Sequence, residues 1–282
     1  MEGGFKRVLG GGNPMATLDF SPMTTRYDPV NALALGQVAK LAYDGKADIE
    51  TQAQAWGLQA KFISDTHILK GDTQAVVLGD GDKVIVAFRG TQPTNLQDWV
   101  TDAQAVLVPG PAGMVHKGFR NALDLVHQRV REAVGALQDR GQSLWVTGHS
   151  LGAGLATLFV AKLRFEEDKP VYGLYTFGQP RTGDRSFARA FDTDFKDLMF
   201  RFVNNSDIVP RVPPRVGLYS HVGTFLYFDE QGILRSDPGF WFRRLDEIKS
   251  AVDDFRKLTP GAIQDHAMDE YLAGLTRRLL PV

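Results

Sequence analysis

The chain contains no cysteine among its 282 residues, which excludes disulfide bonds, thiolate metal sites and a cysteine nucleophile. It also lacks an excess of either charge, since 32 basic residues stand against 33 acidic ones and the formal net charge is -1. This balance excludes the overall attraction to nucleic acid or anionic lipid that a strongly basic chain has. Any contact with a membrane should therefore be local and apolar.

Long apolar runs are absent as well. No stretch reaches the roughly 18 uninterrupted apolar residues of a transmembrane helix, and the first twenty residues lack the apolar core of a signal peptide. We therefore expect a soluble protein with no signal peptide in this chain, whether cytoplasmic or secreted. The glycine-rich residues 1–14 should be a flexible tail or a fusion remnant that lies outside the fold.

The composition is that of an ordinary globular protein, with 43% hydrophobic and 23% charged residues. We expect one domain over residues 15–282, because a single sheet covered by helices on both faces can absorb this length. Strands are predicted at 58–64, 74–78, 84–88, 144–147, 171–177, 199–203 and 224–228. Helices are predicted at 30–42, 118–137, 151–163, 186–195, 242–257 and 262–279. Their alternation predicts an α/β fold with a mainly parallel sheet.

One short motif has a clear chemical meaning. Gly148, His149, Ser150, Leu151 and Gly152 fit the Gly-x-Ser-x-Gly nucleophile elbow, and they stand between a predicted strand and a predicted helix. The two glycines let strand and helix pass close together, while the helix start directs the backbone N–H of Leu151 at an oxyanion. The alternative is that these residues form a glycine-rich turn without function. We predict that Ser150 is the nucleophile, with His149 as a supporting neighbour.

A serine hydroxyl needs a histidine base and an orienting carboxylate. The six histidines stand at 67, 116, 127, 149, 221 and 266, and the chain order serine, acid, histidine leaves His221 and His266 as candidates for the base. Asp207 is the favoured acid, because it directly follows a hydrophobic strand and such loops hold active sites. Its alternative role is to cap the turn before Pro210.

Five ordered blocks resemble the class 3 lipases, a family that includes triacylglycerol lipases of filamentous fungi. The similarity covers about two-thirds of the chain, from Val84 to His266. Its blocks are residues 84–91, 115–119, 175–181, 207–214 and 265–272. The resemblance implies the α/β-hydrolase fold and a catalytic triad of Ser150, Asp207 and His266. It leaves His221 as a residue that packs or hydrogen-bonds beside the acid loop.

The resemblance also implies further site residues. Thr91 would supply an oxyanion donor together with the Leu151 N–H, and Asp102 would orient the Thr91 hydroxyl unless it is an ordinary exposed helix residue. A lid would lie at about 92–106, where Leu96, Trp99, Val100 and Ala103 form one apolar helix face. A fixed helix over the sheet edge fits the same pattern. The aromatic residues 240–242 would line an acyl pocket or anchor the core.

These features together predict a carboxyl-ester hydrolase with a Ser-His-Asp acyl-enzyme mechanism and no metal or organic cofactor. The expected substrate is an ester or lipid, met at a lipid–water interface if the lid opens. Triacylglycerol lipase and broad esterase are the favoured activities, ahead of a phospholipase or a feruloyl-type esterase. A serine peptidase and a non-catalytic lipid- or partner-binding module on the same scaffold are the remaining alternatives. The sequence leaves acyl chain length and oligomeric state open.

Overall fold

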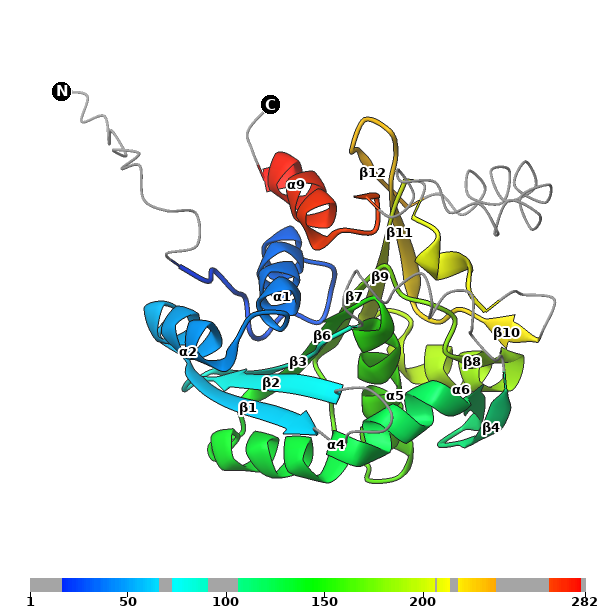
Figure 1. Cartoon of the computed structure of the whole chain (residues 1–282), viewed down its shortest axis with the longest axis horizontal. Helices are drawn as coiled ribbons and strands as arrows, with labels where there is room; N and C mark the ends of the chain where they lie inside the picture. Colours follow the sequence, from blue (N-terminus) through cyan, green and yellow to red (C-terminus); the bar gives the residue numbers. More distant parts are fainter. Residues whose placement is uncertain are drawn as a thin grey trace.

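The computed structural model describes residues 17–65, 73–90, 106–205, 207–213, 218–236 and 264–279. At its centre is an eight-stranded sheet (Figure 1). In spatial order its strands are β1 (Gln59–Asp65), β2 (Thr73–Gly79), β3 (Lys83–Phe88), β6 (Ser143–His149), β7 (Gly173–Phe177), β9 (Met199–Asn204), β11 (Thr224–Phe228) and β12 (Leu234–Arg235).

The middle of this sheet is parallel. Strands β3, β6, β7, β9 and β11 pair in parallel with their neighbours, whereas β1, β2 and β12 add antiparallel edges. Every residue of β6, β7 and β9 is buried, as expected for strands that are covered on both faces. Because neighbouring parallel strands end at one edge of the sheet, the loops after β6, β7 and β9 are brought together there.

Helices cover both faces of the sheet, which confirms the predicted layering (Figure 1). One face packs against α1 (Pro29–Leu41), α2 (Lys46–Ala55) and α9 (Met268–Leu279). The other packs against α4 (Lys117–Leu137), α5 (Leu151–Phe165) and α6 (Arg185–Phe195). Helix α4 follows its predicted pattern, with buried apolar residues three or four positions apart and charged residues between them.

Besides the two-residue edge strand β12, two parts of the fold were not predicted. Helix α2 buries just Ile49 and Ala53, so its sequence has little apolar periodicity. A second, four-stranded sheet consists of β4 (Leu107–Gly110), β5 (Gly113–His116), β8 (Gly183–Asp184) and β10 (Tyr219–Ser220), in the order β10-β8-β5-β4. Strands of two to four residues are too short to show an alternating pattern.

The prediction of one continuous helix from 262 to 279 is wrong. Residues 265–267 form a turn, and α9 begins at Met268. The turn has a physical reason, because the carbonyls of Asp265 and His266 accept hydrogen bonds from the side chains of Asn204 and His149. Those two carbonyls are held by the sheet rather than by a helix. His266 is therefore placed on a turn that faces the ends of the parallel strands.

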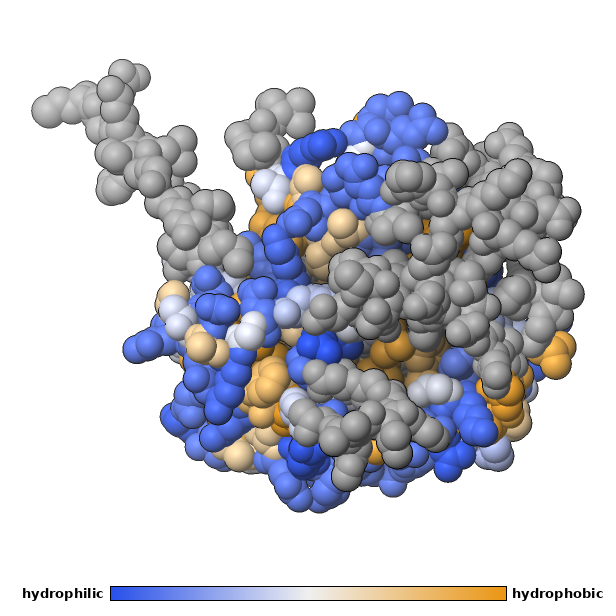
Figure 2. Space-filling model, viewed as in Figure 1, coloured by the Kyte–Doolittle hydropathy of each residue, from blue (hydrophilic) through white to orange (hydrophobic). Residues whose placement is uncertain are grey.

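The surface is mostly hydrophilic on the face shown in Figure 2, with hydrophobic residues gathered near its middle, around the position of α5 in Figure 1. Among the described residues, no helix combines the length and apolarity that crossing a bilayer requires.

Three predicted features lie outside the described residues. They are the lid at 92–106, apart from Val106, the helix at 242–257 and the aromatic residues 240–242.

Candidate active site

Ser150 lies at a strained bend between β6 and α5. Its φ of 59° and ψ of -131° fall in a region that residues with a side chain rarely adopt. The bend requires small neighbours, since a Cβ on Gly148 would lie 2.5 Å from the carbonyl oxygen of Gly152, and one on Gly152 would lie 2.7 Å from the carbonyl carbon of Arg89. These contacts explain both glycines of the elbow by close approach of backbone to backbone.

The elbow is tied to the neighbouring strand and opens a helix. The Ser150 N–H donates to the carbonyl of Phe177 at the end of β7, with a distance of 3.0 Å. Leu151 is the first residue of α5, where backbone N–H groups have no partner within the helix and the helix dipole favours a negative charge. The Leu151 N–H is thus available in the place where an oxyanion-hole donor is expected.

His266 and Asp207 form a buried pair, although they are 59 residues apart in the sequence. The Nδ1 of His266 lies 2.9 Å from Oδ2 and 3.0 Å from Oδ1 of Asp207. Exposure is 4% for His266 and 0% for Asp207, so this hydrogen-bonded pair is shielded from solvent. Because an ionised carboxylate only accepts hydrogen bonds, Nδ1 is the donor in this pair, and in a neutral ring Nε2 then carries the lone pair that a base needs.

Two further donors hold Asp207. The Tyr271 hydroxyl donates to Oδ2 at 2.5 Å, and the Val209 N–H donates to Oδ1 at 2.9 Å. Burial and the neighbouring Asp207 raise the pKa of Tyr271 well above its ordinary value, so its hydroxyl stays protonated and remains a donor. The Tyr271 hydroxyl also accepts the Asn204 N–H at 3.1 Å. Asp207 is thus fixed by groups from η1 (Val209–Arg211) and α9, as well as by His266.

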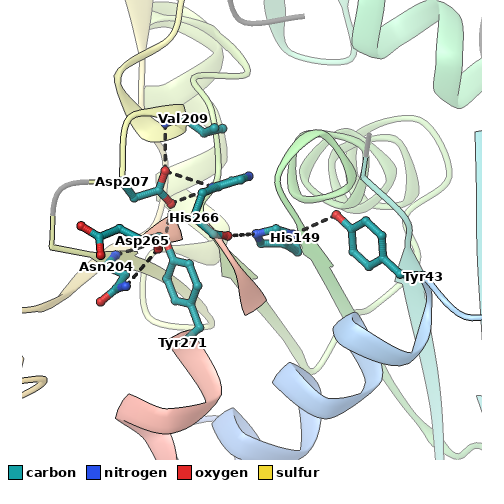
Figure 3. A network of polar contacts seen from close by, with 8 residues as sticks. All are labelled: Tyr43, His149, Asn204, Asp207, Val209, Asp265, His266 and Tyr271. Atoms are coloured by element: carbon teal, nitrogen blue, oxygen red, sulfur yellow. Dashed lines mark hydrogen bonds and ion pairs between the residues drawn. The ribbon is translucent and has the colours of Figure 1, made fainter. Parts of the chain in front are cut away.

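The turn that bears His266 is anchored by its backbone (Figure 3). Asn204 donates from Nδ2 to the Asp265 carbonyl at 2.9 Å, and His149 lies with Nε2 2.7 Å from the His266 carbonyl oxygen. The rings of His149 and His266 are 4.4 Å apart between centroids, with an angle of 31° between their planes. The residue before Ser150 therefore touches both the backbone and the ring of His266.

The two atoms between which a proton would move, the Oγ of Ser150 and the Nε2 of His266, lie close to these contacts. Ser150 is 1% exposed, and neither its Oγ nor the Nε2 of His266 has a hydrogen-bond partner within the part of the chain that the structure describes. Hydrogen bonds between a nucleophile and its base are often long in unliganded sites and tighten when substrate binds. Both groups are therefore available for proton transfer, since no other protein group among the described residues competes for them.

Gly178, just after β7, has no side chain, and the His266–Asp207 pair occupies the space that a side chain there would fill. Its φ is +58°, and an added Cβ would lie 2.8 Å from His266 Nδ1 and 2.9 Å from Asp207 Oδ2. We expect Gly178→Ala to displace the pair and to lower kcat by about 100-fold, as misplacements near 1 Å do. The matched control is Gly57→Ala, at φ +72° with nothing within 4 Å.

Both alanine variants should lose about 1–2 kcal/mol of stability through the left-handed backbone, but Gly57→Ala should keep the wild-type kcat. Ester turnover and denaturant unfolding of the two variants measure these effects. If Gly178→Ala has the same kcat as Gly57→Ala, the space that Gly178 leaves beside His266 is not important for the reaction.

Tyr271 offers a milder test of the same pair. Tyr271→Phe removes the donor to Asp207 and leaves the Asn204 N–H without its acceptor. We expect a loss of about 1.5–3 kcal/mol in the free energy of unfolding, the range for a hydrogen bond to a charged group. We also expect kcat to fall by about 10-fold because the carboxylate is less well fixed. Unchanged unfolding and kcat would contradict the role given to this hydroxyl.

The remaining predicted residues fall into two groups. The Nε2 of His221 lies 2.8 Å from the carbonyl oxygen of Pro210, and since a carbonyl only accepts, Nε2 is the donor. It is thus a hydrogen-bonding neighbour of the acid loop, as the resemblance implied. Thr91, Asp102 and the lid residues Leu96, Trp99 and Val100 lie outside the described residues.

Other residues of the site were not predicted from the sequence. The sequence indicated no role for Tyr43 or Asn204, and Gly178 and Tyr271 stand without a role in the family-like blocks 175–181 and 265–272. A buried glycine with positive φ and a tyrosine that reaches across 64 residues leave no local pattern. The polar Asn204 at the end of a hydrophobic strand was a usable signal, because strand ends at this edge carry functional groups.

Known proteins resemble this chain in sequence and in fold. The family model described as Lipase (class 3) matches residues 85–217. A triacylglycerol lipase of Arabidopsis thaliana is 30% identical over 259 residues, which covers 75% of this chain and 49% of the relative. A solved triacylglyceride lipase of Rhizomucor miehei superposes with a TM-score of 0.61 at 26% identity, covering 72% of this chain and 81% of the other.

By sequence and by fold, the chain is related to the class 3 lipases. Its fold is therefore the α/β-hydrolase fold, as predicted. A second solved structure is described as a triacylglycerol lipase whose catalytic centre is a serine protease triad. It superposes with a TM-score of 0.58 at 27% identity, over 71% of this chain and 80% of that one. The chain spans about half the length of the curated relatives that it matches.

Proposed function

We propose that this class 3 lipase relative hydrolyses carboxyl esters through an acyl-enzyme on Ser150, with His266 as the base and Asp207 as the orienting acid. The observation that carries the proposal is the buried His266–Asp207 pair, with Nδ1 2.9 Å from the carboxylate, beside a serine held at a strained strand-to-helix bend. Strain and buried ionisable pairs occur together at catalytic sites more often than in purely structural regions.

The reaction follows from the direction of these hydrogen bonds. Ser150 Oγ attacks the ester carbonyl carbon while His266 Nε2 takes the hydroxyl proton, and Asp207 stabilises the imidazolium that forms. The imidazolium then gives its proton to the leaving alcohol as the ester C–O bond breaks. A water molecule repeats the sequence on the acyl-enzyme, releasing the carboxylic acid and restoring the Ser150 hydroxyl.

The oxyanion of each tetrahedral intermediate would bind at the start of α5. The Leu151 N–H and the helix dipole supply one donor there, and removing such a donor typically costs about 2.7–4 kcal/mol of transition-state stabilisation. Thr91 is the proposed second donor, with Asp102 orienting its hydroxyl. Thr91 is supported by the family resemblance of the block at 84–91, and Asp102 by the resemblance of the chain to the same family. Both residues lie outside the described residues.

The proposed substrate is an acylglycerol or a simple water-soluble ester. Relatives named triacylglycerol lipase, in Arabidopsis thaliana, and secreted mono- and diacylglycerol lipase, in Fusarium solani, support an acylglycerol. A relative named phospholipase A1, in Oryza sativa, keeps a phospholipid as the second candidate. We propose no cofactor, because the serine mechanism is complete with the chain's own groups.

Turnover of p-nitrophenyl esters over a series of acyl chain lengths tests the proposal. We expect hydrolysis of at least one ester, with no comparable cleavage of the matched p-nitroanilide amides. Preference for the amide would favour a peptidase, and no turnover of any ester, acylglycerol or phospholipid would favour a non-catalytic module.

A lid would give the reaction a dependence on the lipid surface. The proposed lid at 92–106 has its apolar face at Leu96, Trp99, Val100 and Ala103, and its opening would expose that face to lipid. Rate measured across the solubility limit of a short-chain triacylglycerol distinguishes the two cases. A jump when the emulsion forms supports a working lid, whereas smooth saturation supports a fixed helix and an esterase.

A further inference from the structure

The His149 side chain is held between two segments that are far apart in the sequence. Its Nδ1 lies 2.8 Å from the hydroxyl of Tyr43, and its Nε2 lies 2.7 Å from the backbone carbonyl oxygen of His266. Figure 3 shows Tyr43, His149 and His266 in a row that continues to Asp207. The side chain of His149 therefore links the end of α1 to the turn that bears the proposed base.

The partners of His149 set the direction of every hydrogen bond in this row. A backbone carbonyl only accepts, so Nε2 of His149 carries the proton, and Nδ1 must then accept from the Tyr43 hydroxyl. Burial, with His266 nearby, lowers the pKa of His149 well below its ordinary value and keeps the ring neutral. Burial also raises the pKa of Tyr43, so its hydroxyl remains a donor.

The Tyr43 hydroxyl meets a third segment of the site at Gly90. It lies against Gly90, the residue before Thr91, because an added Cβ on Gly90 would collide with it. The same Cβ would lie 2.6 Å from the carbonyl oxygen of His149 and 3.0 Å from the Cβ of Ser150. One hydroxyl thus contacts the end of β3 and the elbow, and reaches the His266 turn through a single imidazole.

We propose that Tyr43 is a positioning residue for the esterase reaction, acting through the neutral His149 to fix the backbone of His266. This inference rests on the proposed function. Residues 265–267 form a turn outside α9, so the base depends on side-chain anchors to its backbone. Holding a base to within a fraction of an ångström contributes to kcat rather than to substrate binding.

Tyr43→Phe removes the hydroxyl and keeps the ring. We expect kcat to fall by about 10-fold with KM within about twofold, as for other residues that orient a reacting group through a hydrogen bond. Tyr175→Phe is the matched control, because Tyr175 is also buried and its hydroxyl accepts the Asp28 N–H at the opposite end of α1. The control should keep the wild-type kcat.

A double-variant cycle separates positioning from packing. His149→Leu removes both polar contacts of the ring, so adding Tyr43→Phe to it should change kcat by less than about twofold. His149→Gln retains one acceptor and one donor, should keep more activity than His149→Leu, and should remain sensitive to Tyr43→Phe. An equal loss from Tyr43→Phe in all backgrounds, or a loss no greater than that of Tyr175→Phe, would overturn the proposal.

A spectroscopic measurement tests the proposal independently of enzymatic activity. Long-range ¹H–¹⁵N spectra of the wild-type chain should show His149 neutral near pH 7 with its proton on Nε2. A proton on Nδ1 would reverse the row of hydrogen bonds and refute the inference even if esters are hydrolysed. Absence of ester turnover in the wild type, with the Nε2–H form present, would instead refute the proposed function and leave the hydrogen-bonded row intact.

Discussion

Replacing Ser150 with alanine should lower kcat for p-nitrophenyl esters by about a million-fold, the loss measured when a serine protease loses its nucleophile. Alanine has no atom that can form the acyl-enzyme, so any residual rate reflects binding and the oxyanion donor alone. The loss should fall on kcat, with KM changed little. Steady-state kinetics on the favoured ester measures both values.

The protein should remain folded when Ser150 is changed. Alanine at φ 59° bears the same backbone strain as serine, and the Ser150 Oγ has no hydrogen-bond partner among the described residues. The midpoint of denaturant unfolding should therefore stay within about 0.5 kcal/mol of the wild type. Retained activity in a folded Ser150→Ala protein would assign the nucleophile to another residue.

His266→Ala should cost nearly as much as the loss of the serine, because nucleophile and base act as a unit and their effects are not additive. His221→Ala provides the matched control, since both histidines follow the elbow and both are hydrogen-bonded beside the acid loop. We expect His221→Ala to lower kcat by less than about 10-fold, because it loses one hydrogen bond to the Pro210 carbonyl and no proton-transfer group.

Stability distinguishes the two histidine variants in a second way. His266→Ala leaves the buried Asp207 without its imidazole partner, although Tyr271 and the Val209 N–H still donate to it. Unfolding should therefore become easier by about 3 kcal/mol, the cost of breaking a buried pair. Equal losses of kcat from the two histidine variants would remove the basis for choosing His266 as the base.

Local periodicity was sufficient for most of the fold. The apolar spacing of α4 and the strand, turn and buried helix around Ser150 could be read directly, because each buries its own residues in a regular pattern. Helix α2 and the short strands of the second sheet could not, since their residues are held by contacts with other segments rather than by their own pattern.

The candidate site, like the fold, could be predicted from the sequence only in part. Ser150 and Asp207 follow from motif and strand-end position, but the choice of His266 over His221 came from the family resemblance, and no local signal supplies it. Tyr43 lies 106 residues from His149 in the sequence, and His149 lies 117 residues from His266. Contacts of that range are created by the fold, so the row of hydrogen bonds through His149 is visible only in three dimensions.

Covalent labelling tests the central claim most directly, because it requires a nucleophilic serine but no knowledge of the natural substrate. The wild-type chain is treated with an active-serine phosphonate ester, digested and examined by mass spectrometry, alongside His266→Ala and His221→Ala. The account predicts one phosphonyl adduct on Ser150, formed readily by wild type and His221→Ala and lost in His266→Ala. An unlabelled Ser150 in the folded wild type, or equal labelling of all three proteins, would contradict it.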